Sequence, residues 1–125
     1  MGVDDAHNHM KQIEKAEHEI IQGYVKKGPC VIVGRSANFV LEEIDSVNVF
    51  VFSDIKDRIS YAVSHYGEDE KQAKLVIEKT DRERKMHAMS FYSKEWGNKN
   101  NYDLLLNSGK LGIEKCVELI VNAVK

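Results

Sequence analysis

Arg35 is the first residue whose type and position could do chemistry. It follows Gly34 and a short apolar run, residues 30–33, which predicts a strand buried on both faces. Ligands of open α/β sheets gather beyond the carboxyl ends of the strands, where arginine offers a planar fork that matches phosphate oxygens. The sequence therefore predicts a phosphate contact at Arg35. The alternative is a surface arginine that pairs with Glu42 or Glu43.

A charged run at residues 80–85 is the second candidate site. On a helix, Asp81 and Arg84 lie three residues apart and share a face, as do Arg82 and Lys85. Together they could present a carboxylate and several cations to a hydroxylated, phosphorylated ligand. The alternative is an ordinary solvated helix face.

Other candidates are weaker. Ser53 and Asp54 follow a second apolar run, but capping of the next helix is the simpler role. A group of large side chains near residues 86–96 could stack a nucleobase, although packing in a core or an interface is the simpler reading. Its members are Met86, Met89, Phe91, Tyr92 and Trp96.

The sequence predicts no metal site. His7 and His9 have no further ligand at metal spacing, and Cys30 and Cys116 have no CxxC partner, so both cysteines are expected to be small buried thiols. No GxxxxGK[ST] segment or looser glycine-rich strand-to-helix loop occurs to hold a triphosphate.

Composition narrows the class of protein. The 125 residues contain 42% hydrophobic and 30% charged residues, which suits one soluble domain with one core. A formal net charge of −2 argues against a nucleic-acid partner, and the longest apolar runs are too short to span a membrane. The polar N-terminus is not a secretory signal, so a cytoplasmic location is expected.

Hydrophobic periodicity predicts the elements that position these residues. Helices are expected over about 10–27, after Ser36, over 55–66, 69–93 and 113–124, and strands over 30–33, 47–52 and 103–106. This order indicates an α/β fold with a short, mainly parallel sheet of about three strands flanked by helices. The whole chain, 1–125, is expected to form a single domain, with 1–9 as a flexible tail.

Several segments, in order, resemble the cytidylate-kinase-like family of bacteria. Residues 28–41 are similar to its "GPCVIVGRCADYIL" stretch, and residues 47–52 followed by Arg58 are similar to a strand and an "ERI"-type helix start. Residues 80–84 resemble its "TDxxR" lid, and residues 96–114 resemble a helix ending in "WG" followed by "NYDLCLNSSKLGIE".

The resemblance implies a three-layer P-loop nucleoside-monophosphate kinase that uses ATP and Mg²⁺ to phosphorylate a nucleotide such as CMP. By the same resemblance, Arg35 would hold the phosphate of the acceptor. Asp81 would meet its nucleoside, Arg84 would meet phosphate, and Arg58 matches a helix arginine of the family. Arginines around the transferring group are what phosphoryl transfer requires.

The chain departs from the family in lacking the P-loop, so its site for ATP and Mg²⁺ is absent from these residues. We therefore expect a truncated kinase fold that is incomplete or inactive by itself. The alternative is a non-catalytic oligomerisation or interaction module derived from a kinase fold.

In the family the P-loop strand lies between the strands that residues 30–33 and 47–52 resemble. Without it, either these two strands pair directly or a second copy of the chain covers them, which predicts a homo-oligomer.

Overall fold

The computed structural model describes residues 3–125. Two compact units make up the chain, Met1–Asp45 and Ser46–Lys125. That the whole chain forms one domain stays a prediction.

The first unit contains α1 (Val3–Lys27) and the single turn α2 (Ala37–Val40). Its small core consists of Ile21, Ala37 and Leu41, with Val25, Ile32 and Val40 packed around them. The helix α1 begins earlier than the predicted residue 10, so residues 3–9 of the expected tail are helical. Residues 1–2 of that tail lie outside the described range.

The strand predicted at residues 30–33 is wrong. These residues form no strand, and Val31 and Val33 are 92% and 89% exposed. A buried parallel strand needs hydrogen-bonding neighbours, and no strand in the described chain lies beside this run. Only Ile32 packs inward, against the core of the first unit.

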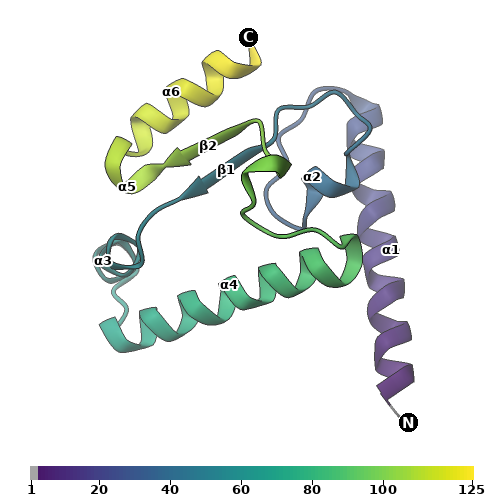
Figure 1. Cartoon of the computed structure of the whole chain (residues 1–125), viewed down its shortest axis with the longest axis horizontal. Coiled ribbons are helices and arrows are strands. Elements are labelled where there is room, and N and C mark those ends of the chain that lie inside the picture. Colours follow the sequence, from purple (N-terminus) through teal and green to yellow (C-terminus); the bar gives the residue numbers. More distant parts are fainter. Residues whose placement is uncertain (1–2) are drawn as a thin grey trace. The chain divides into compact units, whose positions relative to one another are not determined.

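The second unit holds the sheet and the remaining helices (Figure 1). Its elements are β1 (Val49–Phe52), α3 (Ile55–Tyr66), α4 (Glu70–Tyr92), the 3₁₀ turn η1 (Lys99–Asn101), β2 (Leu104–Asn107), α5 (Ser108–Leu111) and α6 (Ile113–Val124). Two of the three predicted strands are therefore confirmed, and the sheet of the described chain has two strands.

The two strands are parallel, and hydrogen bonds at their first residues set which residues lie opposite each other. Val49 lies opposite Leu104, and the series continues to Phe52 opposite Asn107. Just before the strands, the Asn48 carbonyl accepts a bond of 3.2 Å from the Leu104 amide, and the Asn48 amide donates to the Asp103 carboxylate at 2.7 Å. The carboxyl ends of both strands therefore lie side by side.

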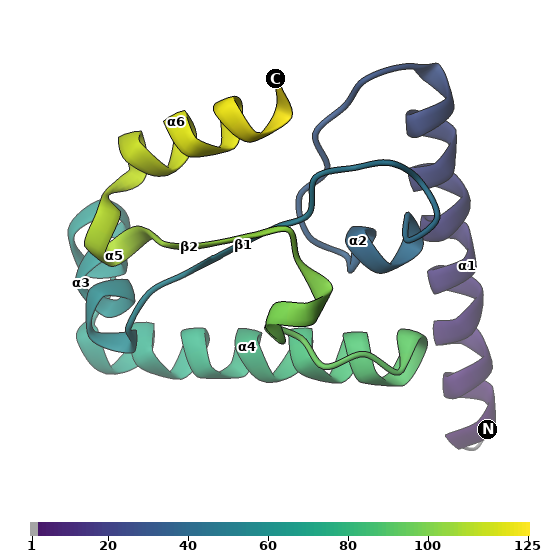
Figure 2. The same cartoon turned by 45° about the horizontal axis from the view of Figure 1, so that its top comes forward.

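Three layers are visible where the strands are seen nearly edge-on, with α6 on one face of the sheet and α4 on the other (Figure 2). Phe50 and Phe52 point to one face, since side chains alternate along a strand and their rings stack with centroids 6.2 Å apart. Leu106 of β2 and Cys116 of α6 are buried, at 4% and 5% exposure.

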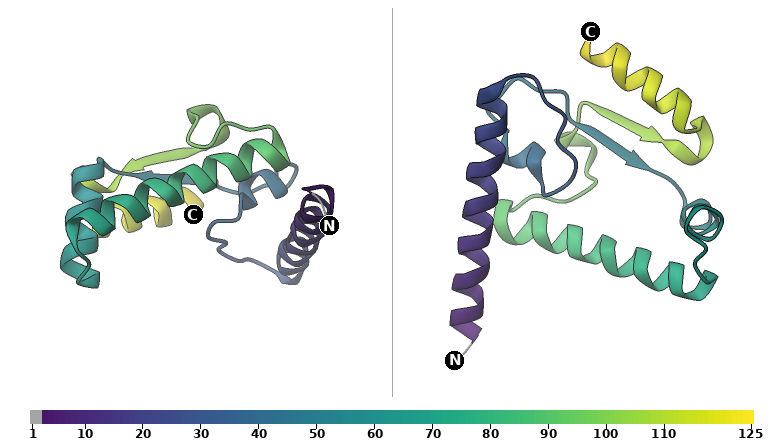
Figure 3. Two further views of the ribbon diagram at one scale, coloured as in Figure 1. Left: turned by 90° about the horizontal axis from the view of Figure 1, so that it is seen from below. Right: turned by 180° about the vertical axis from the view of Figure 1, so that it is seen from behind.

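A tight turn between α3 and α4 brings the two helices together (Figure 3). Gly67 ends α3 with a φ of 66°, a conformation that glycine adopts without strain. The next helix begins at once, because the Asp69 side chain accepts a bond from the Gln72 amide at 3.4 Å. This packing places the first turns of α3 within reach of the middle of α4.

Candidate functional site

A group of three charged side chains joins α3 to α4. Arg58 donates two hydrogen bonds to Asp81, from Nη1 to Oδ2 at 2.6 Å and from Nη2 to Oδ1 at 2.9 Å. Arg84, one turn along α4, donates to Oδ1 of the same carboxylate at 3.2 Å. The predicted shared face of Asp81 and Arg84 is confirmed, and Arg58 joins it from another helix.

The electrostatics of this group favour its charged form. The hydrogen bonds from Arg58 lower the pKa of Asp81 below its ordinary value, against an opposing effect of burial and with help from the charges of Arg58 and Arg84. The same hydrogen bonds raise the pKa of Arg58. Two guanidinium groups share one carboxylate, so the group carries a net charge of +1 and is suited to an anion.

Aromatic side chains lie beside Arg84. Its guanidinium group lies 5.9 Å from the ring centre of Trp96. The Trp96 ring meets Phe50 edge-on with centroids 5.1 Å apart, and Phe50 contacts Tyr102 at 4.9 Å. The aromatic group predicted to pack or to stack a base therefore contributes Trp96 to the surroundings of the arginines.

A pocket of about 170 Å³ lies between these groups. It is lined by Phe50, Val51, Phe52, Ser53, Arg58, Arg84, Trp96 and Ser108. Ser53 and Ser108 directly follow the two strands, so the pocket lies at their carboxyl ends, where ligands of α/β sheets bind. The Ser108 hydroxyl donates to the Phe52 carbonyl at 3.3 Å.

Close packing at the strand ends requires a glycine. A Cβ atom at Gly109 would lie 2.5 Å from an oxygen of Asp57 and 3.1 Å from the Cβ of Ser53. The turn α5 therefore lies directly against the start of α3, on one wall of the pocket.

Arg35 is paired with carboxylates of its own unit. It lies in the first unit, where its Nε donates to Glu17 at 2.9 Å and its guanidinium lies 3.9 Å from Glu14. A surface arginine paired with a carboxylate was the alternative for this residue, and Glu17 and Glu14 are carboxylate partners of that kind. Its contact with a phosphate stays a prediction.

Some lining residues had no place in the sequence-based site. The sequence analysis places Phe50 and Phe52 only in the strand predicted at residues 47–52, and Ser108 only in a segment that resembles the family. The available signal was their place near the carboxyl ends of two neighbouring parallel strands. Asp54, expected as a helix cap, occupies the cap position of α3, but its side chain makes no capping hydrogen bond.

The two cysteines differ in their exposure to solvent. Cys116 is buried, as predicted, whereas Cys30 is exposed because the strand expected to bury it does not form.

No helix in residues 3–125 combines the length and the apolar character needed to cross a bilayer.

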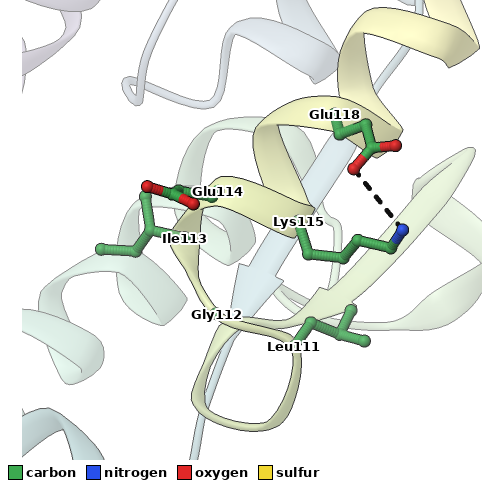
Figure 4. A pocket seen from close by; sticks show the side chains of 6 residues that line it. All are labelled: Leu111, Gly112, Ile113, Glu114, Lys115 and Glu118. Atoms are coloured by element: carbon green, nitrogen blue, oxygen red, sulfur yellow. Dashed lines mark hydrogen bonds and ion pairs between the residues drawn. The ribbon is translucent and has the colours of Figure 1, made fainter.

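A second hollow, of about 440 Å³, lies at the junction of α5 and α6 (Figure 4). It is lined by residues 111–115 and Glu118. Lys115 and Glu118 face each other there at 3.5 Å. The hollow has two carboxylates, Glu114 and Glu118, and the single cation Lys115, so it offers no group of cations to an anionic ligand, and the pocket at the strand ends is the stronger candidate.

Comparison with known proteins gives consistent results. The Cytidylate kinase-like family matches residues 3–110. A cytidylate kinase from Archaeoglobus fulgidus is 27% identical over 113 residues, which are 90% of this chain and 61% of that protein. A crystal structure of an uncharacterized protein from Eubacterium ventriosum superposes with a TM-score of 0.83 at 24% identity, over 92% of this chain and 66% of that one. The chain thus spans about three-fifths of the curated relative's length, and the solved structure supports the fold alone.

Proposed function

Because the chain belongs to the Cytidylate kinase-like family, we propose that the pocket at the strand ends binds the phosphate of a nucleoside monophosphate such as CMP. The observation that carries this proposal is the placement of Arg58 and Arg84 on one carboxylate, in the wall of one pocket. Asp81 fixes both guanidinium groups before a ligand arrives, which reduces the conformational entropy lost on binding.

The chemistry of the pocket suits a phosphate ester. Arg84 keeps about half of its side chain exposed, and one of its five N–H donors is used by Asp81, so others can reach a phosphate oxygen. The rings of Trp96 and Phe50 lie beside it and offer an apolar surface to the nucleoside. Arg35 is the fourth predicted substrate contact, and its role stays part of the proposal.

The described residues do not fit ATP and Mg²⁺. The Asp81 carboxylate in the group is already shared by two arginines, and no carboxylate lines the pocket. The sequence also has no glycine-rich loop to surround a triphosphate. We therefore propose that this chain by itself binds the acceptor and transfers no phosphoryl group from ATP.

Calorimetric titration with CMP, cytidine and inorganic phosphate tests the acceptor site. We expect CMP to bind, cytidine to bind more weakly, and Arg84→Ala to weaken CMP binding about tenfold or more, as loss of a hydrogen bond to a charged group does. Arg82→Ala is the matched control, because Arg82 is an exposed arginine on the same helix and lies outside the pocket. The proposal would be refuted if folded wild-type protein released or absorbed no heat on titration with CMP. It would also be refuted if Arg84→Ala and Arg82→Ala lowered the affinity for CMP equally.

The second candidate function is a non-catalytic module for association. It is favoured by a stripe of exposed apolar residues that recur every three or four positions along α6. These residues are Ile113, Val117, Val121 and Val124. This function predicts that Arg84→Ala leaves the oligomeric state unchanged. A parallel measurement of mass by light scattering on the same variant separates it from the acceptor site.

A further inference from the structure

The loop between α4 and β2 carries Trp96 in a tight turn. The Asn98 amide donates to the Glu95 carbonyl at 3.2 Å, which closes a four-residue turn with Trp96 and Gly97 at its centre. Gly97 has a φ of +84°, close to the value that a type II turn requires at its third residue. Trp96 thus enters the wall of the pocket from a turn and not from a helix or a strand.

Tyr102 holds this turn from the start of β2. Its hydroxyl accepts a hydrogen bond from the Gly97 amide at 3.1 Å. That amide belongs to the peptide group that begins at the Trp96 carbonyl, so the bond restrains the backbone directly after Trp96. Tyr102 is close to a fixed point of the sheet, because the Leu104 amide donates to the Asn48 carbonyl at 3.2 Å.

The ring of Phe50 connects the turn to the tyrosine. It lies 4.9 Å from the ring of Tyr102 and meets the ring of Trp96 edge-on at 5.1 Å. A Cβ atom at Gly97 would lie 3.3 Å from the same ring, so the backbone of the turn packs directly on it. Phe50 and Trp96 line the pocket, whereas Tyr102 does not. Tyr102 therefore acts on a ligand of the pocket only through these two rings.

We propose that Tyr102 is a positioning residue that sets the preference of the pocket for a nucleotide over a sugar phosphate without a base. The inference rests on the proposed function and deepens it, since it assigns the contact with the base to the ring of Trp96. An aromatic side chain that is immobilised only when the ligand arrives loses conformational entropy at that moment, which weakens binding. The bond from Gly97 to the Tyr102 hydroxyl restrains Trp96 beforehand and removes part of that loss.

The contact with the phosphate should not depend on Tyr102. Arg84 lies 5.9 Å from the ring centre of Trp96, but it is held by its bond of 3.2 Å to Asp81 on the same helix. Two further bonds hold Arg58 on that carboxylate. Loss of the Tyr102 hydroxyl therefore leaves both guanidinium groups in place and affects the aromatic wall alone.

Calorimetric titration with CMP and with ribose 5-phosphate, which has the sugar and the phosphate but no base, tests the proposal. Tyr102→Phe removes the acceptor of the Gly97 amide and keeps the aromatic ring. We expect this variant to bind CMP about three- to tenfold more weakly, the effect of one hydrogen bond, and ribose 5-phosphate within about twofold of wild type. Tyr66→Phe is the matched control, because Tyr66 is 70% exposed at the end of α3 and lies outside the pocket. Equal losses for the two ligands, or an unchanged affinity for CMP, would overturn the proposal.

Quenching of tryptophan fluorescence by acrylamide separates this inference from the proposed function. Trp96 is the single tryptophan of the chain, so its emission reports on the ring without any ligand. We expect Tyr102→Phe to raise the quenching constant and Tyr66→Phe to leave it unchanged. A wild-type protein that binds neither ligand would refute the proposed function, and this inference with it. Binding of CMP together with equal quenching in wild type and both variants would refute the role of Tyr102 alone.

Discussion

Replacing Asp81 with asparagine should destabilise the second unit measurably. The substitution keeps the size of the side chain but removes the charge that holds Arg58 and Arg84 together. Asparagine has one acceptor oxygen, so the paired bonds from Arg58 cannot both survive. The two guanidinium groups would then lie close together without a neutralising carboxylate.

The magnitude follows from the exposure of the pair. Breaking a buried ion pair costs about 3–5 kcal/mol, whereas an exposed pair contributes about 0–1 kcal/mol. The side chains of Asp81 and Arg58 are 21% and 30% exposed, which lies between these cases. We therefore expect Asp81→Asn to lower the free energy of unfolding by about 1–2 kcal/mol, since one hydrogen bond is retained.

Urea denaturation followed by tryptophan fluorescence is the appropriate assay. The chain has a single tryptophan, Trp96, and it lies beside Arg84, so its emission reports on this unit. Glu83→Gln is the matched control, because Glu83 lies on the same helix, is largely exposed and forms only a long ion pair of 3.9 Å with Lys79. Equal stabilities of Asp81→Asn and Glu83→Gln, within about 0.5 kcal/mol, would refute the role of the shared carboxylate.

The effect of this substitution should depend on pH with a definite sign. Folding lowers the pKa of Asp81 from its ordinary value of 3.8. A carboxylate of this kind contributes its stabilisation fully above the unfolded pKa and loses it as the pH falls through the folded value. The difference in stability between wild type and Asp81→Asn should therefore be constant from pH 7 to about 5 and shrink below about pH 4. A difference that grows on acidification would contradict this assignment.

The remaining predictions concern glycines. Gly109→Ala should destabilise the protein by about 1 kcal/mol and weaken CMP binding, because the added Cβ moves the Asp57 side chain and presses on Ser53. Gly97→Ala should cost about 1–2 kcal/mol, as its φ is +84° and its Cβ would lie 3.3 Å from a phenylalanine ring. Gly23→Ala, near the C-terminal end of α1 where an added Cβ meets nothing within 4 Å, should instead stabilise the first unit by about 0.5–1 kcal/mol. Thermal denaturation by circular dichroism checks all three, and opposite signs at residues 23 and 109 are the required outcome.

Local sequence patterns were sufficient for α3, α4, α6 and both strands of the second unit, whereas the short turns α5 and η1 were not predicted. The apolar stripe and the glycine stop predicted α3, and α6 has the expected bounds of residues 113 and 124. Apolar runs at residues 47–52 and 103–106 predicted both strands. These features depend on periodicity and capping, which neighbouring residues determine among themselves.

Residues 30–33 show the limit of such patterns. Their β-branched composition favours a strand, but a strand forms only when another lies beside it, and that neighbour is a property of the whole fold. The run therefore remains irregular, and Val31 and Val33 stay exposed. Composition predicted what the segment prefers and could not predict whether a partner is present.

In the candidate site, too, some contacts follow from local spacing and others depend on the whole fold. The spacing of three residues predicted that Asp81 and Arg84 share a helix face, and their contact of 3.2 Å agrees. The shorter bonds from Arg58 connect residues 23 positions apart and depend on how α3 packs against α4. No local spacing encodes that packing, and only the family resemblance pointed to Arg58.

The contact with Arg58 also changes the role that Asp81 can have. By resemblance its carboxylate would meet the nucleoside, yet both of its oxygens already accept bonds from guanidinium groups. A nucleoside hydroxyl would have to share an acceptor with two cations, which weakens its own bond, whereas a phosphate gains from the same two cations. Asp81 is therefore better placed to position the arginines than to select the base. Under the proposed function, selection by base would fall to the aromatic wall at Trp96 and Phe50, where contacts depend on ring shape more than on hydrogen bonds.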